Sequence, residues 1–502
     1  MELFSNLALG FATASTLTNL GFCLIGVLLG TLIGVLPGIG ATATIAMLLP
    51  LTYQIGDPVT SLIMLAGIYY GAQYGGSTTA ILVNMPGESS SAVTAIDGYQ
   101  MARKGRAGPA LAIAAIGSFF AGTVATMIVA VLAIPLIAYA LKFSTAETFA
   151  LMVLGLILAV ALASGSVLKA LAMVVLGVML GLVGSDTISG DVRFAFGIPE
   201  LYEGFNFVAV AVGLFGVAEI LRNLENERGR DTNIAKVGSL YPSRTEWKQM
   251  AWPSVRGTAL GSALGVLPGG GAILASFASY TMEKKVSKNP KEFGQGAVAG
   301  VAGPESANNA AAQTSFIPLL TLGIPANPVM ALMIGAMIIK GVIPGPNVAT
   351  ENPSLFWGLI ASMWIGNLML VILNLPLVGL WVKLLTVPYY ILFPLIMAFC
   401  AIGVYSVNSN VYDLYTVAGF GLLGYILMKL RCEPAPLLLG FVLGDQLEEN
   451  LRQSMIKAFG DPWVMLSRPI TATVLIIALL VLIATFLPAI RKKREEVFVE
   501  EE

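Results

Sequence analysis

Long apolar stretches, separated by short polar or glycine-rich breaks, run through most of the chain. In the first half they lie near residues 17–36, 40–55, 60–84, 108–138, 145–164, 166–184 and 204–222. In the second half they lie near residues 256–282, 297–324, 326–343, 355–382, 388–407, 411–430 and 470–489. A spanning helix needs about 20 mostly apolar residues, and several of these stretches are shorter or interrupted. The pattern predicts an all-α polytopic membrane protein with about 10–12 transmembrane helices, some broken or re-entrant.

A polar linker divides the chain into halves that resemble each other. The sequence GTLIGVLPGIGA, which begins at Gly30, returns as GSALGVLPGGGA from Gly261, at an offset of 231 residues. A weaker echo pairs ILVNMPG from Ile81 with LTLGIPA from Leu320, at an offset of 239. Internal repeats are typical of secondary transporters. We predict a first transmembrane repeat, a cytoplasmic linker, a second transmembrane repeat and a charged cytoplasmic tail, at residues 1–222, 223–253, 254–490 and 491–502.

Basic residues predict the orientation. Only 11% of the 502 residues are charged, yet 18 of the 28 Lys and Arg fall in four clusters: 103–106, 222–256, 284–291 and 491–494. Clusters of this kind mark cytoplasmic loops. Residues 51–58 have no basic residue, so equivalent points of the repeats should face opposite sides, as in an inverted repeat. Strict inversion also requires residues 434–459 to cross the membrane.

Composition excludes several classes of function. The chain has no histidine, and Cys23, Cys400 and Cys432 lie far apart, so neither His-based catalysis nor a Cys or His metal site is expected. A net charge of −1, with the basic residues in short loops, gives no reason to expect a nucleic-acid partner. The N-terminus lacks the basic start of a cleavable signal peptide, so the first apolar stretch should remain as a span. We expect neither cofactor nor enzymatic activity.

Two glycine breaks interrupt apolar segments and are followed by helix-compatible sequence. A helix that starts inside the membrane offers unpaired N–H groups, which attract anions. The alternative is that these glycines only allow close helix packing or a tight turn. Because the break is duplicated, we favour a substrate site, with these candidate residues: Pro37, Gly38, Gly40, Thr42, Gly269, Gly270 and Gly271.

Polar residues also crowd the apolar runs 67–91 and 302–328. We predict further substrate contacts from Gly75, Gly76, Ser77, Thr78, Ser306, Asn308 and Asn309. Oxygen-bearing side chains suit a small hard cation, and the candidates are Thr79, Asn84, Glu305, Gln313, Thr314 and Ser315. Any one hydroxyl can simply bond back to its helix, and Glu305 can sit at an interface. Glu88 and Asp97 are predicted to lie in a cytoplasmic helix or loop.

These motifs carry a resemblance to a known family. The runs GVLPGIGATATIAMLLPLTY, YYGAQYGGSTTAILVNMPGE, GVLPGGGAILASF and GPESANNAAAQTSFIPLLTLGIP look like the large membrane subunit of tripartite tricarboxylate transporters, the TctA family. The stretch APLLLGFVLGDQLEENLRQS also fits, so the resemblance covers nearly the whole chain. It implies cation-driven, mainly sodium-driven, uptake of citrate-like or other carboxylates across a bacterial inner membrane. It also implies two partners, a small membrane subunit and a periplasmic solute-binding protein.

Three other interpretations remain open on the sequence. A passive anion channel needs a polar stripe through many spans, whereas polarity here concentrates in two pairs of motifs. An intramembrane enzyme needs a nucleophile with a base, and we find no pair of aspartates in the spannable segments. A carrier for a non-citrate organic acid would share the same motifs. Clusters of Ser, Thr, Asn and backbone N–H groups do not name one carboxylate.

Overall fold

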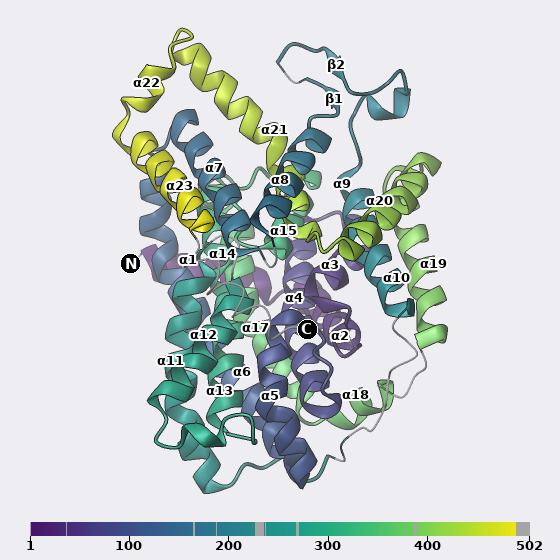
Figure 1. The fold of residues 1–502 in the computed structure, drawn as a ribbon, viewed down its shortest axis with the longest axis vertical. Helices are drawn as coiled ribbons and strands as arrows, with labels where there is room; N and C mark the ends of the chain where they lie inside the picture. The colour runs from purple at the N-terminus through teal and green to yellow at the C-terminus, as the bar shows by residue number, and fades with distance from the viewer. Residues whose placement is uncertain are drawn as a thin grey trace.

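The computed structural model describes residues 2–36, 38–163, 166–186, 188–225, 235, 237–267, 271–385 and 389–487. The described residues form helices almost throughout, with one antiparallel pair of two-residue strands, β1 (Gly184–Ser185) and β2 (Val192–Arg193) (Figure 1). Seven helical stretches are long and apolar enough to cross a membrane: Leu17–Gly34, Ser89–Ala140, Thr145–Leu162, Phe207–Glu225, Pro353–Asn374, Val411–Lys429 and Pro469–Phe486. The predicted all-α polytopic membrane fold is therefore confirmed. Shorter apolar helical stretches in the described residues are Gly40–Tyr53, Val167–Gly181, Pro328–Ile339 and Leu392–Asn408.

The first half contains α1 (Glu2–Ala14), α2 (Leu17–Gly34), α3 (Gly40–Tyr53), α4 (Pro58–Val83), α5 (Ala92–Met101), α6 (Ala107–Ala140), α7 (Thr145–Leu162), α8 (Val167–Gly181), α9 (Phe207–Ala211) and α10 (Ala218–Glu225). Short helical turns η1 (Ser89–Ser91), η2 (Ala102–Arg106), η3 (Pro199–Leu201) and η4 (Val212–Val217) join some of them. The second half contains α11 (Arg244–Gly265), α12 (Gly271–Val286), η6 (Pro290–Glu292), α13 (Ala299–Thr314), α14 (Phe316–Leu322), α15 (Pro328–Ile339), α16 (Val348–Glu351) and α17 (Pro353–Asn374). It ends with α18 (Val378–Leu384), α19 (Tyr389–Asn408), α20 (Val411–Lys429), α21 (Pro434–Lys457), α22 (Pro462–Leu466) and α23 (Pro469–Phe486).

Each repeat contains a helical hairpin that is broken at its tip. In the first repeat α4 ends at Asn84, in the left-handed conformation at φ 56°, before η1 and α5. In the second, α14 ends at Gly323, at φ 70°, before α15. Asn84 and Gly323 are 239 residues apart, which is the offset of the weaker sequence echo. A left-handed residue ends a helix by turning the chain away from the axis. The repeat seen in the sequence is thus a repeat of structure.

Glycine notches let two helix pairs cross at backbone contact. In α2, a Cβ added to Gly30 would lie 2.2 Å from the carbonyl oxygen of Ile68 in α4. In α11, a Cβ added to Gly261 would lie 2.2 Å from the carbonyl oxygen of Ala307 in α13. Small residues favour close helix association in membranes. There the hydrophobic effect does not drive helices together, because lipid tails are as apolar as the helix surfaces. The α2–α4 pair and the α11–α13 pair are therefore equivalent cores of the two repeats.

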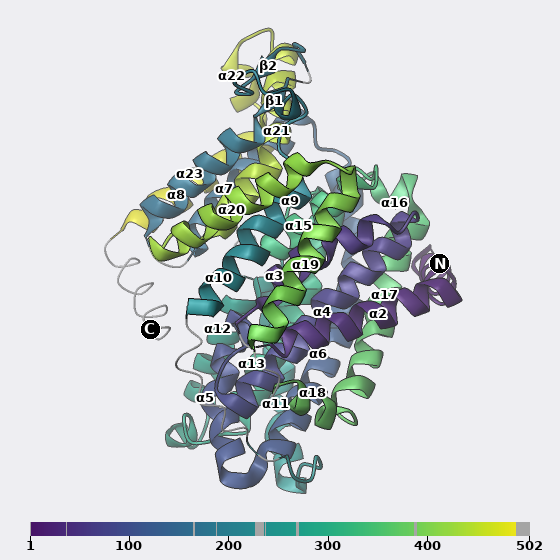
Figure 2. The same cartoon turned by 90° about the vertical axis from the view of Figure 1, so that its right-hand side faces the viewer.

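A lysine that follows each hairpin bonds to the other repeat. Lys104 follows α5, and its Nζ donates to the carbonyl oxygen of Gln295, beyond α12, over 2.5 Å. Lys340 follows α15, and its Nζ donates to the carbonyl oxygen of Tyr53, at the end of α3, over 2.7 Å. The two contacts are separated along the long axis, because α5 lies toward one end of the molecule and α15 near its middle in both views (Figures 1 and 2). The inverted relation of the repeats stays a prediction.

The basic regions expected in the cytoplasm lie together. Arg106, after α5, forms an ion pair with Glu246 in the first turn of α11, and Lys104 reaches the segment that follows Lys291. Loop 103–106, the start of α11 and the segment 284–297 therefore share one end of the molecule. The helix α11 begins at Arg244, inside the predicted linker, and the charged tail at 491–502 lies outside the described residues.

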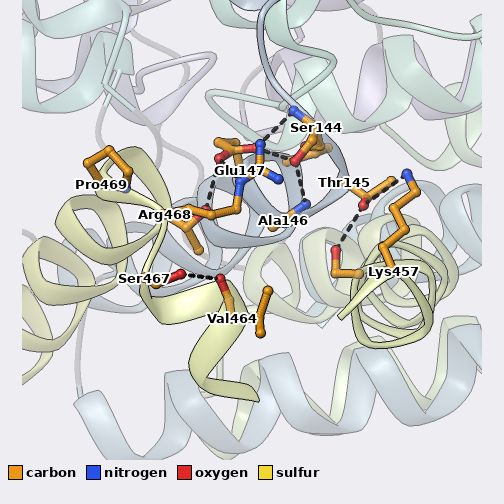
Figure 3. A network of polar contacts seen from close by, with 12 residues as sticks. Ser144, Thr145, Ala146, Glu147, Lys457, Val464, Ser467, Arg468 and Pro469 are labelled. Atoms are coloured by element: carbon orange, nitrogen blue, oxygen red, sulfur yellow. Dashed lines mark hydrogen bonds and ion pairs between the residues drawn. The ribbon is translucent and has the colours of Figure 1, made fainter. Parts of the chain in front are cut away.

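A polar network fastens the last helices to the first repeat. The side chain of Glu147 caps α7 by accepting from the Ser144 N–H over 2.9 Å, and it also accepts from Arg468 Nε, before α23, over 2.7 Å (Figure 3). Nearby, Ser454 Oγ in α21 donates to Thr145 Oγ1 over 2.9 Å. Glu147 has the capping role that its place at the edge of an apolar run indicated. It also pairs with an arginine from the other end of the chain.

The outer helices present apolar surface to the bilayer. On α23 the side chains of Leu479, Leu480 and Ile483 are more than half exposed, at 54%, 59% and 53%. By contrast, α4 and α13 are buried along most of their length although they carry hydroxyl and amide side chains. Polar residues inside and apolar residues outside are expected of a protein whose solvent is lipid.

Candidate functional site

The glycine breaks lie against the hairpin tips. The N–H of Gly40, which starts α3, donates to the carbonyl oxygen of Gly87 in the first tip over 2.8 Å. In the second repeat, a Cβ on Gly271, which starts α12, would lie 3.6 Å from Asn327 Nδ2 in the second tip. Glu88 and Asn327 therefore occupy equivalent places, one beside each break. At these two contacts each break meets a hairpin tip, at Gly87 and at Asn327.

Gly38 supports the first break through its backbone. Its φ of 81° lies in the left-handed region, and an added Cβ would lie 2.8 Å from Oδ1 of Asn223 in α10. The side chain of Asn223 donates in turn to the carbonyl oxygen of Gly38 over 3.3 Å. Thr42 is half-buried in the first turn of α3. The predicted residues Pro37, Gly269 and Gly270 lie outside the described residues.

Glu305 is fully buried in α13 and joins three helices. Its carboxylate accepts from Ser77 Oγ in α4 over 2.7 Å and from Thr94 Oγ1 in α5 over 2.5 Å. No ion pair between Glu305 and Lys or Arg occurs within the described residues. A carboxylate without a counter-charge, deep in a membrane protein, is costly and marks a functional position. Of the two interpretations given to Glu305, the interfacial one does not fit this burial.

The residues after Glu305 carry unsatisfied polar atoms. Asn308 is fully buried, and neither its amide oxygen nor its amide nitrogen forms a hydrogen bond in the structure. Ser306 Oγ is also buried without a partner, although Asn309 Nδ2 donates to Ser118 Oγ in α6 over 2.7 Å. Buried polar groups are paired in the great majority of proteins. Unpaired groups beside a buried carboxylate are therefore candidates to contact a bound ligand.

Glu88 lies within this polar region, half-buried at the first tip. Its carboxylate accepts from Ser90 Oγ over 2.5 Å, and it is close enough to Glu305 for the two charges to interact. A Cβ added to Gly76 would meet Glu88 Cγ at 3.1 Å and Ser91 Oγ at 3.2 Å. Because Gly76 has no side chain, the first hairpin tip can pack against α4 at this position.

Several other predicted residues serve packing or lie elsewhere. Gly75 packs against the α2 backbone, and Thr79 and Thr314 donate to carbonyl oxygens of their own helices. The side chain of Ser315 does the same, while Gln313 Oε1 accepts from Thr126 in α6 over 3.4 Å. Asn84 is exposed at the helix end. Thr78 lines a small cavity with Tyr74, Ser77, Ser118 and Asn374.

The prediction for Glu88 and Asp97 as parts of a cytoplasmic helix or loop missed their inward orientation. Asp97 is fully buried, and its Oδ1 accepts three backbone N–H groups, from Gly294, Gly296 and Ala297, over 2.9, 2.7 and 2.8 Å. Its Oδ2 accepts from Tyr280 over 3.0 Å. Asp97 therefore fixes α5 of the first repeat to the α12–α13 connection of the second.

Asn327 also escaped the sequence analysis. Its side chain caps α15 by accepting from the N–H of Met330 over 2.9 Å, and it faces the second break. The sequence could have indicated this residue, because Asn327 stands 239 residues after Glu88, which is the offset of the weaker sequence echo. Among the described residues, no group of three or more His, Cys, Asp or Glu could hold a metal ion. The site is built from hydroxyl, amide and carboxylate oxygens.

Two structural repeats with broken helices around a buried polar site are typical of secondary transporters. Comparison with known proteins agrees, because the family model described as the tripartite tricarboxylate transporter TctA family matches residues 20–439. The chain belongs to this family, whose name indicates a system of three components. The predicted resemblance is therefore confirmed.

Two curated proteins of Agrobacterium vitis are similar to the chain. One is described as an uncharacterized 52.8 kDa protein in the TAR-I ttuC' 3' region; it is 64% identical over 502 residues, covering all of both chains. The other, an uncharacterized protein in the TAR-II ttuC' 3' region, is 65% identical over 242 residues, which are 48% of this chain and all of that protein. No solved structure matches the chain.

Proposed function

We propose that this chain is the membrane subunit that carries a small carboxylate inward, coupled to a cation, across a bacterial inner membrane. It would work with a small membrane subunit and a periplasmic solute-binding protein. Citrate-like tricarboxylates are the leading substrates, and other organic acids are the alternative. The cation is sodium or, failing that, the proton.

One observation carries this proposal: both glycine breaks start helices directly beside the hairpin tips, at Gly40 with Glu88 and at Gly271 with Asn327. Helix N-termini favour carboxylate oxygens through the helix dipole and the N–H groups of the first turn, although the N–H of Gly40 itself already donates to the Gly87 carbonyl oxygen. The described helices bring no buried Lys or Arg into an ion pair at this place, so the anion would be held by several weaker donors. A weakly held anion is released more readily than one paired with a buried cation.

The passive channel and the intramembrane enzyme are less well supported. A channel requires a continuous polar path, whereas the polar residues here are buried at the junction of two hairpins and two breaks. An intramembrane enzyme needs a nucleophile with a base. The carboxylates of this polar region, Glu88 and Glu305, have hydroxyl and amide neighbours but no basic side chain beside them within the described residues. We therefore keep the carrier as the proposed function.

Gly271→Val tests the substrate site. The backbone of Gly271 is helical, and an added Cβ would make only ordinary contacts with Asn327, at 3.6 and 3.9 Å. We expect a folded protein that has lost at least about 90% of carboxylate uptake, because the branched side chain fills the space beside the N-terminus of α12. Uptake of labelled carboxylate by cells that express the complete system measures this.

Gly419→Val is the matched control, since Gly419 lies on the exposed face of α20 and an added Cβ would meet nothing within 4 Å. Both variants should reach the membrane in wild-type amounts and elute as single species. If Gly271→Val transports as well as wild type, the second break is a packing feature, and the substrate site lies elsewhere.

A further inference from the structure

We propose that Glu88, Ser91 and Asn308 bind the coupling cation as one sodium ion, with Glu305 as the adjoining negative charge. The inference rests on the proposed function. It assigns the ion to the first of the two equivalent places, where Glu88 lies beside the break at Gly40. Glu88 belongs to the tip of the first hairpin, whereas Asn308 belongs to α13 of the second repeat. An ion held by both would therefore connect the two repeats.

The first argument is the balance of charge. Glu88 packs against Gly76, and Glu305 accepts from the neighbouring Ser77, so the two carboxylates lie near each other. Within the described residues no Lys or Arg side chain forms an ion pair with either. Two like charges at a low-dielectric site destabilise each other unless a proton or a cation neutralises one of them. The N-terminus of α3, beside Glu88, supplies only a partial positive charge, so a full positive charge from a bound cation would complete the balance.

The second argument separates a metal cation from a proton. A proton needs only a carboxylate, whereas sodium needs several oxygen ligands. Ser91 Oγ is fully buried without a hydrogen-bond partner, and it lies with Glu88 Cγ against the bare Cα of Gly76. Asn308 is near the Glu88 carboxylate, and its amide oxygen has no well-aligned partner. A site that binds only a proton would not require Ser91 Oγ or the amide oxygen of Asn308.

The two repeats carry different charges at the equivalent place beside each break. The place of Glu88 is taken in the second half by Asn327, which carries no charge and whose amide oxygen already caps α15. Glu305, which accepts two hydroxyl donors, likewise lies with the first tip through Thr94. Negative charge therefore gathers at the first tip, which suits the cation, and the neutral Asn327 side suits the substrate carboxylate.

Binding of ²²Na⁺ to the purified full-length chain tests the assignment without any substrate. Glu88→Gln removes the charge but keeps the shape, and we expect sodium affinity to fall at least about tenfold, because charge count sets the affinity of such sites. Glu88→Asp should retain measurable binding. Ser91→Ala should weaken binding by about threefold to tenfold, because it removes one neutral oxygen.

Two matched variants serve as controls. Ser262→Ala removes another buried hydroxyl without a partner, in α11, and Glu200→Gln removes an exposed carboxylate in η3. Both should bind ²²Na⁺ like wild type, and thermal unfolding should show that all variants are folded. Wild-type affinity in a folded Glu88→Gln protein overturns the inference.

The inference and the proposed function fail in different ways. A wild-type system that accumulates carboxylate while the chain binds no ²²Na⁺ overturns the sodium site and leaves the carrier standing. A wild-type chain that binds ²²Na⁺ through Glu88 supports the site even where the carboxylate tested is the wrong one. No carboxylate accumulation by the assembled system, over a panel of di- and tricarboxylates, overturns the proposed function.

Discussion

Glycine serves different purposes at different positions of the site. Gly38 is needed for its left-handed backbone, Gly76 for the space that admits Glu88 and Ser91, and Gly271 for access to the start of α12. Sequence alone places all of these in glycine-rich segments but does not separate the roles, because φ and the distance to the next backbone are set by the tertiary fold. A valine at Gly38 would therefore strain the backbone and disturb folding, unlike a valine at Gly271.

Asp97 offers a residue-scale prediction about stability. Asp97→Asn replaces a carboxylate that accepts three backbone N–H groups and the Tyr280 hydroxyl with a neutral amide, which is a weaker acceptor and adds an unwanted donor. We expect a loss of about 1–3 kcal/mol in unfolding free energy. Thermal unfolding of the purified protein measures the lowered Tm.

Glu200→Gln, at an exposed carboxylate, is the control for the Asp97 variant and should leave the Tm unchanged. An Asp97→Asn protein as stable as wild type would show that the hydrogen bonds to residues 294–297 do not hold α5 in place.

At the scale of helices, the notched crossings are the most demanding part of the fold. Gly30→Leu and Gly261→Leu each force a large side chain to where an added Cβ would already lie 2.2 Å from a carbonyl oxygen. Overpacking costs about 1–3 kcal/mol where side chains can move, and more is expected here because the contact is with backbone. We expect both variants to lose the monodisperse species in detergent size-exclusion chromatography.

Gly419→Leu places the same side chain on a face of α20 where nothing lies within 4 Å of an added Cβ, so it should elute like wild type. Were Gly30→Leu to remain monodisperse and active, the α2–α4 crossing would not be the tight core described above.

The sequence predicted the repeated elements better than the contacts of their tips. Periodicity and the echoes at 231 and 239 residues locate both breaks and both hairpins, because those features are local. The inward turn of Glu88 is not local: it depends on the hydrogen bond from the Gly87 N–H to the Gly76 carbonyl oxygen, over 3.3 Å. For the same reason Asn84, which looked like a ligand, proved to be an exposed helix end, while Asn327 was overlooked.

At the scale of the whole molecule, the basic loops predict the topology. Loop 103–106 and segment 284–291 lie at one end of the structure, and both are basic, so both should face the cytoplasm. Single cysteines at Lys104 and Lys288, in a background without Cys23, Cys400 and Cys432, should resist a membrane-impermeant thiol reagent in intact cells. Both should react once the membrane is made permeable.

A cysteine at Gly56, in the loop between α3 and α4, should behave in the opposite way, because residues 51–58 have no basic residue and are predicted to face the other side. Labelling of the Lys104 or Lys288 cysteine in intact cells would contradict this topology.

The central claim is that the chain is a coupled carrier, and accumulation against a gradient tests it most directly. Proteoliposomes with the chain and its small membrane subunit, supplied with the solute-binding protein and labelled citrate or a competing carboxylate, would be given an inward sodium gradient. The account predicts an internal carboxylate concentration above the external one, which collapses when an ionophore dissipates the sodium gradient. Uptake that stops at equal concentrations and ignores both sodium and proton gradients would contradict it and identify a passive channel.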